Sequence, residues 1–161
     1  MTTVRQPHSN LSKNEFAQQL ANKGLVALQS SRLLLKHGDC SGAIDRAYVS
    51  MYCMALTALE CEQVNFPVSF SVKHATLSNE LFSRFVSNGR LSMKLAADFD
   101  RTHADRNAND LAYAPAGFSQ AQYIVDSAVM FFYAIQDLFE VLDPETLPSA
   151  DPTRERDRAK A

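Results

Sequence analysis

Hydrophobic positions recur along the chain at helical spacing, and no segment shows the strict alternation that is typical of strands. In the first such segment, Ser12 and Glu15 form a capping box, in which two side chains satisfy free amides at the start of a helix. Leucines follow at roughly helical spacing until Gly38, a residue type that ends many helices. This pattern predicts a first helix over residues 12–36, with the leucines Leu20, Leu25, Leu28, Leu33 and Leu35.

The second predicted helix is apolar around most of its circumference. Asp39 or Ser41 can cap its first turn, and it runs to about residue 61. Only Asp45 and Arg46 carry charge before Glu60. A helix of this kind belongs at the centre of a bundle or in a subunit interface.

The rest of the chain predicts three more helices. After a connection over residues 63–70, a third helix covers residues 71–86 and stops at Asn88-Gly89. A fourth runs over residues 91–109 or slightly beyond and is broken before Pro115. Ser119 and Gln122 form a second capping box, which opens a fifth, largely apolar helix to about residue 141.

Together these segments predict an all-α fold, an antiparallel bundle of four or five helices in one domain. Residues 1–11 are expected to form a flexible leader, residues 12–142 the bundle, and residues 143–161 a disordered, solvated tail rich in prolines and alternating charges. Two of the predicted helices are apolar around nearly their whole circumference, which is more apolar surface than the core of one small domain can bury. The remaining apolar surface predicts a binding partner, and a second copy of the same chain is the simplest one.

Composition narrows the classes of function. The 161 residues carry a formal net charge of −2, which argues against a broad cationic surface for duplex DNA but leaves room for a local basic pocket. Motifs for di-metal, zinc, nucleotide-fold and hydride chemistry are absent, so we expect no metal and no cofactor.

The cysteines and the hydrophobic runs indicate a cytoplasmic protein. The three cysteines are odd in number and include no C-x-x-C pair, and Cys53 and Cys61 are most simply small buried side chains. Reduced thiols and the absence of a signal peptide favour the cytoplasm. Asp126 and Gln136 interrupt the late apolar stretch, so we expect no membrane span.

One strip of the fourth helix gathers the polar groups. Arg106, Asp110 and Tyr113 stand at i, i+4 and i+7, and His103 and Asn107 lie on or beside the same stripe. Burying such groups costs several kcal/mol unless each finds a partner. The strip therefore either holds the bundle in register, for example through an Arg106–Asp110 ion pair, or acts on a polar ligand.

Several patterns together resemble the HEPN superfamily of small α-helical proteins, over about residues 14–141. They are Ala43-x-x-Arg46-Ala47-Tyr48-x-x-x-Tyr52, a histidine (His74) that opens the third helix, and Arg106-Asn107-x-x-Asp110. The resemblance is to a branch whose pattern reads Arg-Ala-Tyr-Tyr, then His, then Arg-x-x-Ala-Asp-Tyr. It implies a HEPN-like bundle.

The ribonuclease members of that superfamily carry an arginine, a polar residue, a spacer, and then histidine, x and tyrosine. Arg106, Asn107 and Tyr113 match three of these positions, but Leu111 replaces the histidine. In catalytic members two such motifs meet across a dimer, and arginine plus histidine cleave RNA without a metal. The imidazole serves acid–base chemistry and the guanidinium stabilises phosphorane charge, and leucine can do neither.

His103 is the candidate to replace the missing imidazole, because it precedes Arg106 by one turn on the same face. The alternative for His103 is a purely structural helix residue, either exposed or with its hydrogen bonds satisfied. The alternative for His74 is a helix cap or a packing partner. Arg46 is a further candidate for substrate binding, unless it is held by neighbours of Asp45 or reaches Asp110.

The resemblance also implies a setting, namely a prokaryotic toxin–antitoxin or defence module. Such proteins often occur beside a small nucleotidyltransferase, which in characterised pairs modifies the motif tyrosine, here Tyr113. The first hypothesis is therefore a homodimeric protein that binds or cleaves RNA in a composite polar cleft lined by Arg106, Asn107, Asp110 and Tyr113. The alternative is a catalytically inactive interaction module or regulatory subunit.

Overall fold

The computed structural model describes residues 13–62 and 71–148. These residues form five α-helices and no strand, which confirms the predicted all-α class. The elements are α1 (Lys13–Lys36), α2 (Cys40–Cys61), α3 (His74–Leu81), the π-helical turn η1 (Phe82–Val86), α4 (Met93–Asp110), α5 (Phe118–Phe139) and the 3₁₀ turn η2 (Pro144–Thr146). The predicted leader, the Ser12 cap, the connection over residues 63–70 and positions 149–161 of the predicted tail lie outside the described residues.

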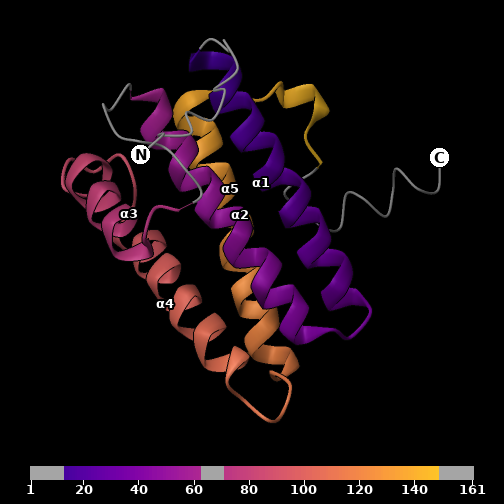
Figure 1. Ribbon diagram of the computed structural model, residues 1–161. Coiled ribbons are helices and arrows are strands. Elements are labelled where there is room, and N and C mark those ends of the chain that lie inside the picture. Colours follow the sequence, from indigo (N-terminus) through magenta and orange to yellow (C-terminus); the bar gives the residue numbers. More distant parts are fainter. Residues whose placement is uncertain (1–12, 63–70, 149–161) are drawn as a thin grey trace, which may run out of the picture.

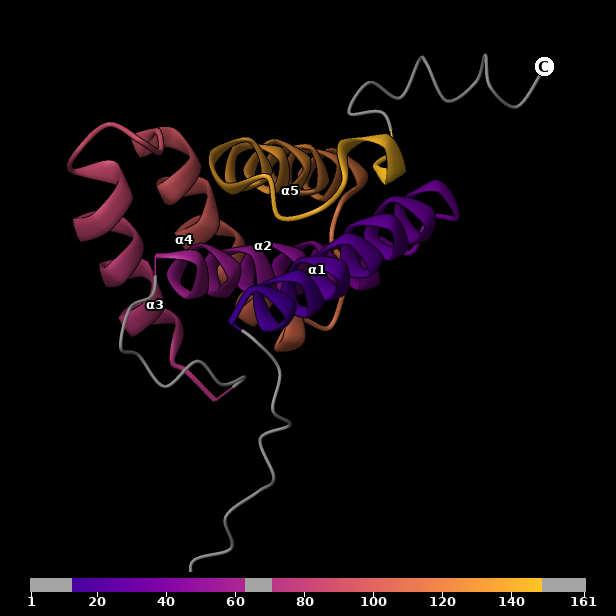
Figure 2. The ribbon, with the colours of Figure 1, turned by 90° about the horizontal axis from the view of Figure 1, so that it is seen from above.

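Helix α2 is the centre of the bundle. It packs against α1, α4 and α5, and α3 contacts it as well. Figures 1 and 2 show α1 and α2 side by side, α5 against both, and α3 and α4 on the side away from α1. Most α2 side chains are buried in this way. The central position predicted for α2 is confirmed, and its apolar circumference is covered without a second chain.

Close approach of α1 and α2 depends on a glycine. A Cβ atom added at Gly24 would lie 3.2 Å from the sulfur of Met54 and 3.4 Å from Cβ of Cys53.

Cys53 is fully buried, and burial raises the pKa of its thiol to about 11. Cys61 is half-buried, and the described cysteines form no disulfide.

The two candidate caps of α2 have separate roles. Asp39 is the N-cap and accepts a hydrogen bond from the amide of Gly42 at 2.8 Å. The Ser41 hydroxyl donates to Oδ1 of Asn109 at 3.0 Å and accepts from the amide of Ala116 at 3.3 Å. Ser41 thereby ties the α4–α5 connection to the beginning of α2.

The predicted capping box at Ser119 and Gln122 is wrong. Helix α5 begins at Phe118, and its N-cap Gly117 makes no side-chain capping bond. The helix starts earlier because the Gly117 carbonyl already accepts from the amide of Ala121 at 3.0 Å. Gln122 lies within the helix, and its side chain donates to Asp126 at 2.9 Å.

The chain leaves α5 through a left-handed residue and returns along the bundle. Glu140, the C-cap, has φ of 46°. Buried Gln136 then clasps the backbone of Leu142: its amide nitrogen donates to the carbonyl at 2.7 Å and its amide oxygen accepts from the N–H at 3.1 Å. Residues 143–148 of the predicted tail include η2, and Leu147 packs against the core.

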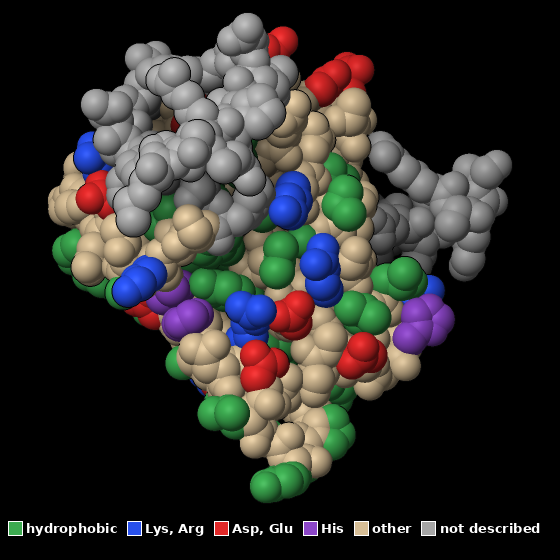
Figure 3. Space-filling model, viewed as in Figure 1, with side chains coloured by type: hydrophobic (Ala, Val, Ile, Leu, Met, Phe, Trp, Pro, Cys, Tyr) green, Lys and Arg blue, Asp and Glu red, His purple; other side chains and the backbone are tan. Residues whose placement is uncertain are grey.

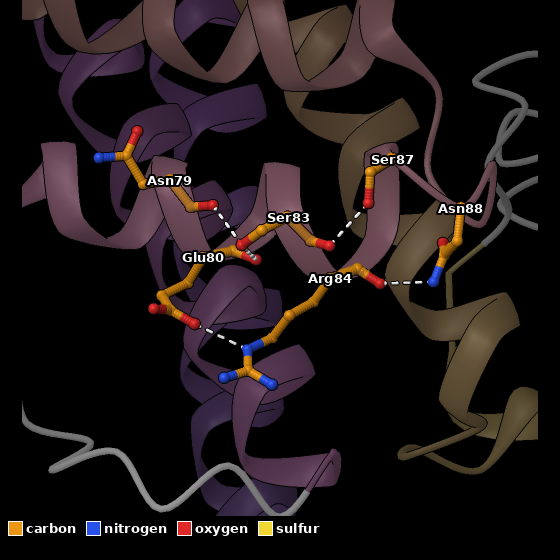
Figure 4. A network of polar contacts seen from close by, with 6 residues as sticks. All are labelled: Asn79, Glu80, Ser83, Arg84, Ser87 and Asn88. Atoms are coloured by element: carbon orange, nitrogen blue, oxygen red, sulfur yellow. Dashed lines mark hydrogen bonds and ion pairs between the residues drawn. The ribbon is translucent and has the colours of Figure 1, made fainter.

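The predicted third helix is present as α3 followed by η1. The amide of Ser87 bonds to the carbonyl of Phe82 at 2.9 Å, five residues back, which is the π-helical spacing. Side chains along this segment bond to carbonyls four residues earlier, as Figure 4 shows: Ser83 to Asn79, Ser87 to Ser83 and Asn88 to Arg84. Gly89 then turns the chain at φ of 77°, at the predicted stop.

Residues 13–62 and 71–148 contain no helix with the length and hydrophobicity of a membrane-spanning segment.

Candidate functional site

Arg106 points from α4 toward α2. Its Nε lies 2.6 Å from Oδ1 of Asp45, and its guanidinium carbon lies 5.0 Å from the centre of the Tyr48 ring. The proposed Arg106–Asp110 ion pair is therefore wrong. Arg106 lies on the side of α4 that packs on α2, where the carboxylate of Asp45 is available, whereas the Asp110 side chain is exposed.

A pair of stacked imidazoles lies beside this ion pair. The rings of His74 and His103 are parallel within 6°, with centroids 3.9 Å apart. His74 uses both nitrogens: Nε2 lies 2.9 Å from Oδ1 of Asp100, and Nδ1 lies 3.1 Å from the Tyr48 hydroxyl. Burial raises the pKa of Tyr48 to about 12, so its phenol keeps the proton that it donates to His74.

His103 is held as a neutral ring. Its Nε2 accepts from the amide of Asn107 at 3.2 Å, and its Nδ1 is buried with no hydrogen-bond partner among the described residues. Burial, and next the charges of His74 and Arg106, lower its pKa, although Asp100 acts in the opposite direction. His103 is therefore a neutral imidazole at neutral pH.

A pocket of about 400 Å³ opens next to Arg106, where α1, α2 and α4 come together. Within the described residues Arg46 lines this pocket and forms no ion pair. On the face shown in Figure 3, histidine side chains lie next to basic and acidic ones. The lining combines cations, tyrosines and apolar groups: Lys23, Arg46, Tyr48, Val49, Tyr52, Cys53, Val72 and Arg106.

The structure brings together four of the six predicted site residues. Arg46, His103, Arg106 and Asn107 lie around Tyr48 or next to its neighbours. Asp110 and Tyr113 do not join them.

The predicted polar strip is wrong at its end, because α4 stops at Asp110 and Leu111 is its C-cap. The last amides bond only three residues back, and Pro115 disfavours helix in the residue before it. Tyr113 therefore leaves the helical stripe. Its side chain is fully exposed, and that of Leu111 is 85% exposed.

Three charged residues of this region were not singled out as site residues. Asp45 had a signal, since it is the one acid of α2 before Glu60 and a half-buried carboxylate needs a cation. Asp100 precedes His103 by one turn, which is a weak signal. Lys23 lines the pocket because α1 packs on α2, and no local sequence pattern indicates this packing.

Tyr48 belongs to the hydrophobic core and Tyr52 packs against it, and both hydroxyls have partners. The Tyr48 hydroxyl bonds to His74, and the Tyr52 hydroxyl donates to the carbonyl of Val72 at 2.7 Å. His74 is a packing partner, because α3 has Lys73 as its N-cap and no side-chain capping bond. Among the described residues, no group of three or more His, Cys, Asp or Glu side chains could hold a metal ion.

Comparison with known proteins does not assign the chain to a family: no family model matches it, and no curated protein matches it in sequence.

Proposed function

We propose that this chain is a HEPN-like protein that binds RNA through phosphates in the pocket between α1, α2 and α4. The observation that carries the proposal is Arg46, a half-buried cation without an ion pair in the described chain, beside Arg106 in one concave site. Positive charge in a cleft with low-dielectric walls focuses the potential and attracts anions. Guanidinium groups suit phosphate because they donate two parallel hydrogen bonds.

The charge distribution supports RNA over duplex DNA as the ligand. The whole chain carries a formal charge of −2, whereas this pocket gathers three cationic side chains, Lys23, Arg46 and Arg106. Duplex DNA is bound by extended cationic surfaces that contact many phosphates. A single-stranded segment can place one or two phosphates in a pocket and its bases against tyrosine and valine side chains.

The proposal includes a homodimer, for which the outward face of α4 provides a surface. Ala97, Ala104 and Ala108 are exposed there between Met93 and Leu111, which are 62% and 85% exposed. Small side chains let a second helix approach closely. The edge of α4 that carries His103 and Asn107 borders this face, so a second copy would contribute to one composite polar cleft. The setting would be a prokaryotic toxin–antitoxin or defence module with a nucleotidyltransferase partner, as the family resemblance implies.

Metal-independent RNA cleavage is the second candidate function. The observation in its favour is that His103 lies one turn from Arg106, and the lowered pKa of His103 favours the neutral form that a general base needs. The geometry supports binding better. Both nitrogens of His74 are engaged, Nδ1 of His103 is buried, and Leu111 and Tyr113 lie outside the pocket. If RNA remains intact after incubation with the protein, cleavage is excluded and the chain is an RNA-binding protein or a regulatory subunit.

The test is the binding of a labelled single-stranded RNA, measured by fluorescence anisotropy at several salt concentrations. We expect Arg46→Ala to lower the affinity by about tenfold and to reduce the slope of log K against log salt by about 0.7, the value for one phosphate contact on a single strand. Arg84→Ala is the matched control, because Arg84 pairs with Glu80 on α3 and η1, outside the pocket. An absence of RNA binding at low salt, or equal loss in both variants, would overturn the proposal.

The homodimer has a separate test. Ala104→Arg places a long cation in the middle of the exposed face of α4, so it should convert a dimer to a monomer in sedimentation velocity. Ala75→Arg, at an exposed position of α3, should leave the sedimentation coefficient unchanged. A wild-type protein that is monomeric at micromolar concentration contradicts this part of the proposal.

A further inference from the structure

The stacked histidines lie where α3 begins and next to one wall of the pocket. Val72, which lines the pocket, precedes His74 by two residues, and its carbonyl is held by Tyr52. His74 belongs to α3, and it reaches His103 and Asp100 of α4. The imidazole pair is therefore one attachment of the N-terminal end of α3 to α4.

The two rings of the pair have different charged and titratable neighbours. Asp100 accepts from Nε2 of His74, and the hydroxyl of Tyr48 can reverse its role and accept from Nδ1. Both ring nitrogens of His74 therefore lie against oxygen atoms that can accept a hydrogen bond. His103 has no carboxylate in hydrogen-bond contact, and Arg106 follows it by one turn. The facing groups are Tyr48 and Asp45 of α2, the latter through Arg106, and Asp100, Arg106 and Asn107 of α4.

A second proton would place two cations face to face at a centroid distance of 3.9 Å. Like charges at this separation repel strongly in a partly buried site. The lowered pKa of His103 agrees with this, because burial and the neighbouring His74 and Arg106 oppose its charged form. Separation of the two stacked rings relieves this repulsion most directly.

We propose that the His74–His103 pair is a proton-operated switch on the pocket, in which a second proton separates the rings, releases the N-terminal end of α3 from α4 and displaces the wall at Val72. The switch concerns the regulation of the site described above, and it rests on the proposed function only in that this site holds RNA. Its direction follows from linkage. A histidine that folds in its neutral form stabilises the closed state above its unfolded pKa of about 6.5, and this stability is lost as the pH falls below that value.

The experiment is hydrogen exchange of the full-length protein at about pH 7 and about pH 5, corrected for intrinsic rates. We expect exchange in the first turn of α3 to rise by about tenfold or more at the lower pH in the wild type. His37→Gln removes an exposed histidine outside the pair and should behave like the wild type. His103→Phe keeps a ring but cannot be protonated, so its α3 should remain protected.

A second variant keeps the test decisive. His103→Gln should also abolish the pH response if the phenylalanine variant is misfolded. Equal exchange at both pH values in the wild type, or an unchanged response in both His103 variants, would overturn the switch. RNA binding without a pH response of α3 refutes the switch alone, and a switch in a protein that binds no RNA refutes the proposed function alone.

Discussion

Phe99→Ala is expected to lower the free energy of unfolding by about 3–5 kcal/mol, the range for removing a buried phenylalanine ring. Phe99 is completely buried and connects the core to the candidate site. Its ring is stacked with those of Phe131 at 5.4 Å and Tyr48 at 6.0 Å, and it contacts His74 at 4.5 Å. The substitution therefore leaves a cavity directly beneath the stacked histidines.

Urea denaturation followed by circular dichroism measures this loss, and a second phenylalanine provides the control. Phe118→Ala removes the same ring at a position that is 58% exposed, so it should change stability by about 0.5 kcal/mol or less. Similar values for the two variants would mean that α4 is not seated on α5 and α2 as described.

The double variant Arg46→Ala/Arg106→Ala should lower RNA affinity by roughly 100-fold, since it removes both guanidinium groups that line the pocket. The two residues share one ligand site, so their individual losses need not add. Anisotropy titrations at constant low salt measure the effect, and Arg84→Ala is again the control that removes a cation outside the pocket.

The same double variant should remain folded, with a loss of about 1 kcal/mol or less. The Arg106–Asp45 pair has side chains 32% and 40% exposed, and exposed ion pairs contribute little to stability. The contact of Arg106 with the Tyr48 ring adds a similar small amount. A loss of about 3 kcal/mol, the scale for breaking a buried pair, would show instead that Arg106 is structural.

Hydrophobic spacing was sufficient to predict the helices because their existence depends on local periodicity. The central place of α2 also followed from its sequence, since a helix with charges only at Asp45, Arg46 and its last turn must be covered on most sides. The capping box at Ser119 failed because Gly117 supplies a backbone N-cap first. Capping side chains favour a helix start but do not exclude an earlier one.

The candidate site was only partly predictable, because a strip of polar residues on one helix does not indicate which other helix it will face. Three residues of the strip, Arg106, His103 and Asn107, lie together on α4 beside Tyr48. The partner of Arg106 is Asp45, 61 residues away, so the pair depends on how α4 packs against α2. The end of the strip failed because the helix stops before Tyr113.

The clasp between Gln136 and Leu142 decides where the chain tolerates alteration at its carboxyl side. Gln136 is 3% exposed, and its amide is satisfied only by the Leu142 backbone among the described residues. A truncation at the end of α5 would strand that amide in an apolar interior, with a penalty of about 1–3 kcal/mol. Affinity tags and fusion partners therefore belong after residue 148, where they leave the returning segment intact.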